Sequence, residues 1–131
     1  MPVNYRIDGN VVTIHPVGAH STGDLREAWH AAEADLAYPK PITSLRICVD
    51  ARDSEALGKR SVTELRETAH WFSERALASS RICAFITRPG LQYGLTRMMA
   101  AWIEYKGYKA FVTTNPQAAI NWLQIATPSR E

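Results

Sequence analysis

The sequence predicts a single α/β domain in which about four helices cover one mixed β-sheet, in the order β-β-α-β-α-β-α-β-α. Residues 81–123 read as strand, helix, strand and helix, because short apolar runs rich in β-forming residues alternate with amphipathic segments. Strands joined by a helix-length connection pair in parallel. At the start of the chain, alternating residues on both sides of the turn at residues 8–10 predict an antiparallel hairpin. The sheet is therefore expected to be mixed.

Composition limits the classes of protein to consider. The chain has 131 residues, of which 46% are hydrophobic and 21% charged, enough for one ordinary core. We expect the domain to span residues 1–126, followed by a short polar tail at 127–131. A net charge of +2 is too small to favour nucleic acid or an anionic membrane as partner. Without a signal-peptide pattern or a membrane-spanning run, a cytoplasmic protein with no stable membrane insertion is expected.

The first half of the chain predicts the hairpin, a helix and a third strand. Residues 3–7 alternate apolar and polar side chains, and residues 11–15 return as the second strand. A helix is expected from a polar cap in residues 21–24 to about Tyr38, where two prolines end it. Residues 45–50 are almost continuously apolar, as in a strand with both faces covered. The inward stripe of the helix comprises Leu25, Trp29, Ala32 and Leu36.

Three more helices are expected in the second half. Ser61 and Glu64 fit a capping box for the first, which places Trp71 on its outward face. Its inward residues are Val62, Leu65, Ala69, Phe72 and Ala76. The next helix stops before Gly107, a residue that favours helix ends, and carries Tyr93 and Ile103 off its inward face. That inward face is expected to comprise Leu91, Leu95, Met98, Trp102 and Tyr105. The last helix is expected to have Asn115 as its cap, Pro116 at its first position, and Ala119, Trp122 and Leu123 facing inward.

This order of elements, with the segments YGLTRMM, KAFVT and AAINWL, resembles the SpoIIAA-like branch of the STAS-like superfamily, named for sulphate transporters and anti-sigma-factor antagonists. The resemblance covers nearly the whole chain and implies a binding or regulatory module. In that superfamily a serine in an Asp-Ser-Ser-Gly-Leu-Gly pattern is phosphorylated and controls docking to a kinase. Here residues 53–58 read DSEALG, so the second serine and the first glycine are replaced. Ser54 and Ser61 remain as hydroxyls near a helix start, where capping and turn formation are sufficient roles.

Charged residues are expected at the carboxyl ends of the parallel strands, where ligands of such sheets tend to bind. Asp50 and Arg52 follow the third strand, and Arg88 follows the fourth. Two arginines beside helix starts are suited to a phosphate or a carboxylate. The alternative is an ion pair between Asp50 and one of the arginines, which ties the loops together without a ligand.

No motif in the sequence predicts a metal, a cofactor or a reaction. The four histidines, His15, His20, His30 and His70, have no metal-ligand spacing. Cys48 and Cys83 lie in apolar runs and are expected to be buried, reduced thiols. A nucleophile elbow, a P-loop and a dinucleotide fingerprint are missing from the sequence. An unassigned hydrolase or transferase is a remote alternative.

Two hypotheses for function follow. The first is a non-enzymatic module that binds a protein partner, or a second copy in a homodimer, through residues 50–61 and the next helix, with Trp71 or Tyr93 at the interface. The second is a carrier or sensor of a small apolar or amphipathic ligand, lipid-like, between the sheet and the helix that starts at Leu91. Its fold-level support is the similarity of the SpoIIAA-like branch to CRAL-TRIO-type lipid carriers. Its pocket would use Leu95, Met98, Met99 and Trp102, with Arg88 or Arg52 at the polar head.

Overall fold

One mixed sheet of five strands organises the protein, with the strands in the order β1-β2-β3-β4-β5. The computed structural model describes residues 3–36, 45–56, 59–75 and 77–126. The strands are β1 (Val3–Asp8), β2 (Val11–Pro16), β3 (Arg46–Asp50), β4 (Ile82–Ile86) and β5 (Lys109–Thr113). The helices are α1 (Thr22–Leu36), α2 (Val62–Arg75), α3 (Leu77–Ser80), α4 (Leu91–Tyr105) and α5 (Pro116–Ile125). The expected fold class is confirmed, with the four-residue α3 as an additional turn of helix after α2.

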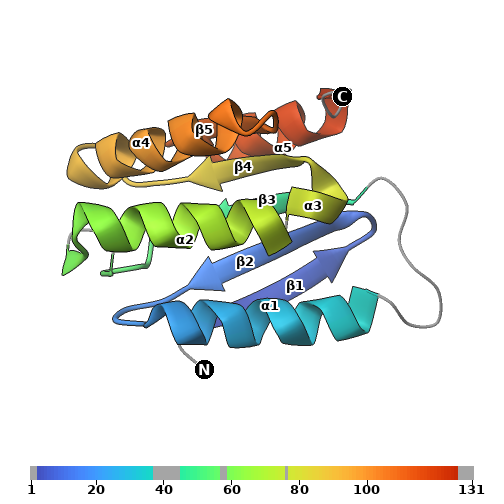
Figure 1. Cartoon of the computed structure of the whole chain (residues 1–131). Coiled ribbons are helices and arrows are strands. Elements are labelled where there is room, and N and C mark those ends of the chain that lie inside the picture. The colour runs from blue at the N-terminus through green and yellow to red at the C-terminus, as the bar shows by residue number, and fades with distance from the viewer. Residues whose placement is uncertain (1–2, 37–44, 57–58, 76, 127–131) are drawn as a thin grey trace.

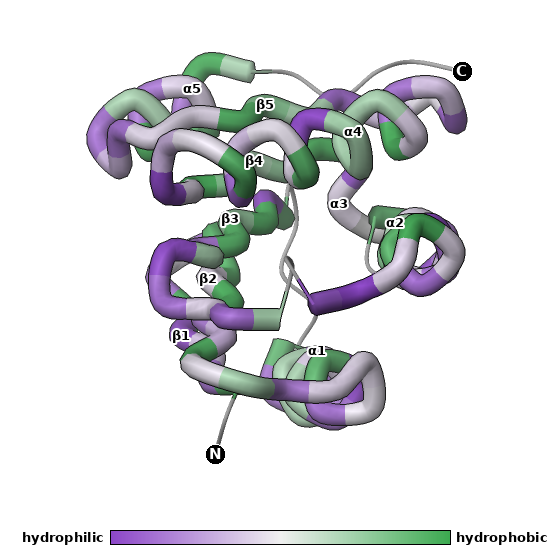
Figure 2. Tube along the Cα trace, turned by 90° about the vertical axis from the view of Figure 1, so that its left-hand side faces the viewer, coloured by the Kyte–Doolittle hydropathy of each residue, from purple (hydrophilic) through white to green (hydrophobic). Residues whose placement is uncertain are grey.

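Strand pairing follows the expected pattern. β1 and β2 form an antiparallel hairpin, and the pairs β2–β3, β3–β4 and β4–β5 are parallel. Helices α1, α2 and α4 cover one face of the sheet, whereas α5 packs on the other face against β4 and β5 (Figures 1 and 2). Both faces of β4 are therefore covered, which explains why all five of its residues are buried.

Two apolar cores result, one on each side of the sheet. The larger core joins the sheet to α1, α2 and α4, and the smaller joins it to α5. Cys48 belongs to the smaller core and Cys83 to the larger, so the two free thiols lie on opposite faces of neighbouring strands. Burial raises the pKa of Cys48 to about 11 and also raises the pKa of Cys83. Both thiols are therefore protonated and unreactive at neutral pH.

The expected helix caps are confirmed. Ser61 and Glu64 exchange backbone-to-side-chain hydrogen bonds of 3.0 and 3.1 Å at the start of α2. Asn115 accepts bonds from two backbone amides of α5, where Pro116 occupies the first turn. Gly107 has a φ of +96° directly after α4, a conformation that other residues rarely adopt. The expected end of α1 near Tyr38, and the tail at 127–131, lie outside the described residues.

The prediction for the inward face of α4 is wrong by about one residue. Leu91 and Tyr105 are 69% and 88% exposed, whereas Ile103, expected off that face, is fully buried. The buried residues are Gln92, Thr96, Met99, Ala100 and Ile103. Each of the first three follows a residue of the expected stripe, which is a rotation of the helix by about 100°. The physical reason is Gln92, whose side chain bonds to the loop after β3 and so holds a polar face of α4 inward.

Helix α2 shows a second difference. Leu65, Ala69 and Phe72 are buried as expected, but Val62 is 56% exposed and Trp71 is half-buried. Val62 is the first residue of the helix, beyond the edge of its packed surface. The remaining expected inward residue, Ala76, lies outside the described residues. Trp71 faces α1, where Arg26 lies 5.6 Å from the centre of its ring. Because α2 has a neighbouring helix as well as the sheet to pack against, its buried arc is wider than one stripe.

Candidate functional site

A small cavity lies between the sheet and the three helices that cover its first face. Its volume is about 90 Å³, and its walls are almost entirely apolar. Strands β2, β3 and β4 provide Ile14, Val49 and Phe85 as the floor, while Met99 and Ile103 of α4 form part of the wall. Trp29 of α1 and Trp71 and Phe72 of α2 complete the apolar lining. The apolar faces of these strands and helices therefore form the walls of the cavity.

One end of the cavity is polar and is built from three separate segments. Gly18 and Ser54 form an isolated parallel bridge that brings the loop after β2 against the loop after β3. Gly18 has a φ of +62°, which glycine adopts without strain. Within this junction, Nε2 of His20 lies 2.8 Å from Oγ of the buried Ser54. Arg60, just before α2, donates to the carbonyl oxygen of His20 at 3.1 Å.

The position of Arg60 favours one tautomer of His20. A guanidinium nitrogen of Arg60 lies 3.4 Å from Nδ1 of His20, and a guanidinium can only donate. We assign Nδ1 as the acceptor of this contact, which places the ring proton on Nε2, where it donates to Oγ of Ser54. The pair is thus arranged so that His20 gives a hydrogen bond to the serine. A general base would need the opposite tautomer.

His20 also makes the stability depend on pH. Burial, and then the charge of Arg60, lower its pKa below the ordinary 6.5, although the Ser21 backbone and Asp24 oppose this. As the pH falls below about 6.5, the unfolded chain takes up this proton first, so the folded state loses stability. We expect urea unfolding to show a smaller free energy at about pH 5.5 than at about pH 7.5. The variant His20→Gln should reduce that difference, whereas His30→Gln, on the exposed side of α1, should leave it unchanged. Equal pH dependence in all three proteins would contradict this assignment.

Two polar atoms buried in the walls of the cavity have no hydrogen-bond partner among the described residues. They are Nε1 of Trp29 and Oγ1 of Thr96, and each side chain is only 2% exposed. A buried N–H or hydroxyl without a partner costs about 1–3 kcal/mol. Such groups in a native cavity call for a ligand or a water molecule that completes them.

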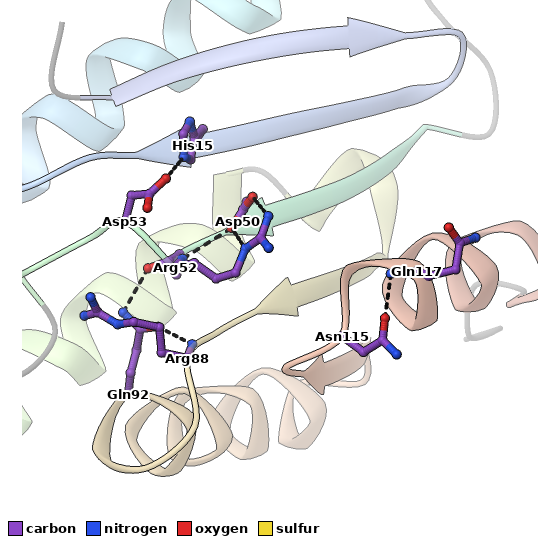
Figure 3. Close-up of polar contacts among 9 residues, drawn as sticks. His15, Asp50, Arg52, Asp53, Arg88, Gln92, Asn115 and Gln117 are labelled. Carbon is purple, nitrogen blue, oxygen red and sulfur yellow. Dashed lines mark hydrogen bonds and ion pairs between the residues drawn. The ribbon is translucent and has the colours of Figure 1, made fainter.

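The charged residues predicted at the strand ends do not line this cavity. Arg52 forms a two-pronged ion pair with Asp50, with distances of 2.9 and 2.8 Å (Figure 3). Arg88 is exposed and donates to the carbonyl oxygen of Ser54 at 3.0 Å. Ser61 caps α2 at the surface. Of the residues predicted from the phosphorylation pattern, the structure brings only Ser54 into the cavity.

The aromatic and methionine residues that were predicted to bind are divided between two environments. Trp71 lines the cavity, and Tyr93 packs against the larger core. Met98 and Trp102 are half-buried and also pack against the larger core without lining the cavity, and the guanidinium of Arg66 lies 5.0 Å from the centre of the Trp102 ring. Met99, the neighbour of Met98, is the α4 methionine that reaches the cavity. Of the α4 residues expected at the pocket, Met99 lines the cavity, whereas Leu95, Met98 and Trp102 do not.

The remaining titratable groups do not form a metal site in the part of the chain that the structure describes. His15 pairs with Asp53 at 2.7 Å on the exposed side of the same loops (Figure 3). His70 lies on the surface of α2, 3.2 Å from Glu74. Among the described helices, none is long and apolar enough to cross a membrane.

Three residues of the site had no signal in the sequence. His20, Arg60 and Gln92 belong to segments far apart in the chain, and each was unremarkable in its local pattern. The buried Gln92 joins them indirectly, because its side chain donates to the carbonyl oxygens of Ala51 and Ser54. It also accepts from the backbone N–H of Arg88 (Figure 3). Only the pairing of β2 with β3, extended by the Gly18–Ser54 bridge, places them together.

Comparison with known proteins identifies the fold. No protein-family model and no curated protein matches the chain. It is similar to the crystal structure of an uncharacterized protein of the DUF3478 family with a SpoIIAA-like fold, from Shewanella loihica PV-4. The two chains are 17% identical, the TM-score is 0.61, and the alignment covers 92% of this chain and 91% of the other. The chain therefore has a SpoIIAA-like fold, as the resemblance in its sequence predicted.

Proposed function

We propose that this SpoIIAA-like domain is a binding module that holds a small, mainly apolar ligand in the cavity between the sheet and helices α1, α2 and α4. The observation that carries this proposal is an apolar cavity whose walls contain the unpartnered polar atoms of Trp29 and Thr96. Oγ1 of Thr87 is also buried without a partner among the described residues, but Trp29 and Thr96 line this cavity, where a ligand can reach their polar atoms. A ligand with one polar group would supply the missing hydrogen bond and fill the space at the same time.

The size of the cavity limits the ligand. At about 90 Å³ it is smaller than an engineered cavity of roughly 150 Å³ that binds benzene. It is also well below the several hundred Å³ of a typical cofactor or drug site. A lipid-sized molecule therefore does not fit the cavity as it stands. The carrier hypothesis is retained in a narrower form, for a ligand of only a few carbon atoms.

The surface side-chain contacts between α1 and α2 are weak, so these helices can separate there to admit a ligand. Arg75 of α2 pairs with Glu33 of α1 at 3.1 Å, and Arg26 lies over the ring of Trp71. Both are contacts of surface side chains, which contribute little to stability, typically below about 1 kcal/mol each. Separation of these helices at the surface is thus inexpensive relative to unfolding. We propose access between α1 and α2.

Filling the cavity tests this function directly. Met99→Trp is expected to occupy the space and to abolish binding of a small neutral probe, isobutanol, because the added ring has nowhere else to pack. Met98→Trp is the matched control, since Met98 does not line the cavity, and it should bind the probe within about twofold of the unaltered protein. Shifts of backbone amide signals in an NMR titration would report both affinities and confirm that each variant is folded. Equal binding by the two variants, or no binding by the unaltered protein, would remove the cavity as the site.

Association with a protein partner, or a homodimer, has less support from the described surface. The anchor expected for it, Trp71, is half-buried against α1, and Tyr93 packs against the core. The large exposed apolar side chains of α4, Leu91 and Tyr105, are its first and last residues. They are about 20 Å apart along the helix and so do not form one patch.

A further inference from the structure

The polar end of the cavity contains a positive charge that no carboxylate of the described residues contacts. Arg60 lines the cavity and is half-buried. Its hydrogen bonds go to the carbonyl oxygen and Nδ1 of His20 and, at 3.4 Å, to Oγ1 of Thr68. These partners are all neutral. Among the described residues, no Asp or Glu lies within ion-pair distance of the Arg60 side chain.

The nearest acidic group does not neutralise this charge. Burial lowers the pKa of Arg60, and the carboxylate of Glu64 partly offsets the effect. Glu64 is committed to the capping box of α2, where it accepts from the backbone of Ser61. It is also an exposed residue, so water screens its charge. An arginine remains charged at any pH that proteins experience, and a partly desolvated guanidinium is most stable with an anion beside it.

Hydrogen-bond donors exceed acceptors at this end of the cavity. Oγ of Ser54 already accepts from Nε2 of His20 and from the backbone N–H of Ala56 at 3.2 Å, so its own proton is left to donate. The indole N–H of Trp29 is a donor without an acceptor among the described residues. Arg60 adds a cationic donor. Thr96 can serve as donor or acceptor. A complementary ligand group therefore accepts hydrogen bonds and carries negative charge.

We propose that the ligand is the anion of a small carboxylic acid, with its carboxylate accepting from Arg60, Ser54 and the indole N–H of Trp29, and its apolar tail among Val49, Met99 and Ile103. This inference rests on the proposed binding function and adds the chemical class of the ligand. An ionised carboxylate only accepts hydrogen bonds, and its two oxygens match the fork of a guanidinium. The volume of the cavity limits the tail to about three to five carbon atoms. Inorganic phosphate has the charge but no tail to fill the apolar part.

The test uses three probes of one shape. Isobutyrate, isobutanol and isobutylamine share the same branched tail and carry a negative, a neutral and a positive head. For so few atoms we expect a dissociation constant of about 1 mM for isobutyrate, followed by amide shifts in an NMR titration. Isobutanol should bind about tenfold more weakly, since a hydrogen bond between a guanidinium and a carboxylate is stronger than one to a neutral hydroxyl. Isobutylamine and inorganic phosphate should show no binding at the cavity.

Substitution of Arg60 separates the class of ligand from the existence of the site. Arg60→Met should weaken isobutyrate about tenfold and leave isobutanol within about twofold. Arg60→Lys, which keeps the charge, should restore part of the preference for the acid. Arg97→Met removes an exposed arginine of α4 that does not line the cavity and should leave both affinities unchanged.

The outcomes distinguish the two proposals. If isobutanol binds as tightly as isobutyrate, or if Arg60→Met weakens both equally, the carboxylate assignment is overturned while the cavity stands as a binding site. If neither isobutyrate nor isobutanol binds to the unaltered protein, both proposals fail. Tighter binding of phosphate than of isobutyrate would also overturn the inference, because it would assign the charge to an ion without an apolar tail.

Discussion

Replacement of Ile103 by alanine is expected to lower the free energy of unfolding by about 3 kcal/mol, because this side chain is fully buried in the larger core. Ile103 lies on the buried face of α4 and also forms part of the cavity wall. Truncation removes buried methyl and methylene groups and enlarges a space that is already present, so the surrounding residues cannot close it. Urea unfolding at neutral pH, followed by circular dichroism, measures the loss as a lower midpoint at constant slope.

Tyr105→Ala is the matched control on the same helix. Tyr105 is 88% exposed, so its removal should change the free energy of unfolding by less than about 0.5 kcal/mol. The sequence pattern predicted the reverse order, with Tyr105 inward and Ile103 outward. A larger loss for Tyr105→Ala than for Ile103→Ala would restore that pattern and show that the rotation of α4 described above is wrong.

Local patterns were sufficient for the elements and their order. Alternation in β1 and β2, the nearly continuous apolar run of β4, and the caps at Ser61 and Asn115 all depend on residues a few positions apart. Parallel pairing followed from the length of the connections. These features are short-range, which is why the mixed sheet and the SpoIIAA-like fold could be predicted from one sequence.

The rotation of a helix depends on contacts that are distant in the chain. Hydropathy alone favoured the face of α4 that contains Leu91 and Trp102, because polar residues count as outward in such a pattern. The structure turns Gln92 and Thr96 inward instead. Gln92 is stabilised there by carbonyl groups of the loop after β3, and no spacing within α4 reveals those partners. The buried face of α4 therefore includes two polar residues together with Met99, Ala100 and Ile103.

The candidate site could not be predicted from the sequence, for a related reason. Arg52 and Arg88 were the arginines at the predicted strand ends, yet Arg52 is paired with Asp50 and Arg88 lies on the surface. Arg60, close to the capping box of α2, is the arginine that lines the cavity. Its role arises only because the bridge between Gly18 and Ser54 brings His20 beside it. Register between strands, and not composition, assembles the polar end.

Gln92→Leu is expected to cost about 2 kcal/mol in the free energy of unfolding, although leucine is a good residue for helices and similar in size. Gln92 is buried, and its side-chain oxygen accepts from the backbone of Arg88 at 2.7 Å. Leucine would leave that N–H without an acceptor and remove two donors from the loop carbonyls of Ala51 and Ser54. Loss of a partner by a buried polar group accounts for the expected size of the effect.

The same substitution should also weaken ligand binding, because Gln92 holds the loop that carries Ser54 against α4. Gln117→Leu is the matched control. Gln117 is exposed on α5, and its side chain donates to the side-chain oxygen of Asn121 on the same helix at 2.9 Å. It should change stability by less than about 0.5 kcal/mol and leave the affinity for isobutyrate unchanged. If Gln92→Leu were as stable as the unaltered protein and bound the probe equally well, the buried amide would not be what fixes α4. The polar end of the cavity would then need another support, since the hydrogen bonds of Gln92 are the direct side-chain link from α4 to the Ser54 loop.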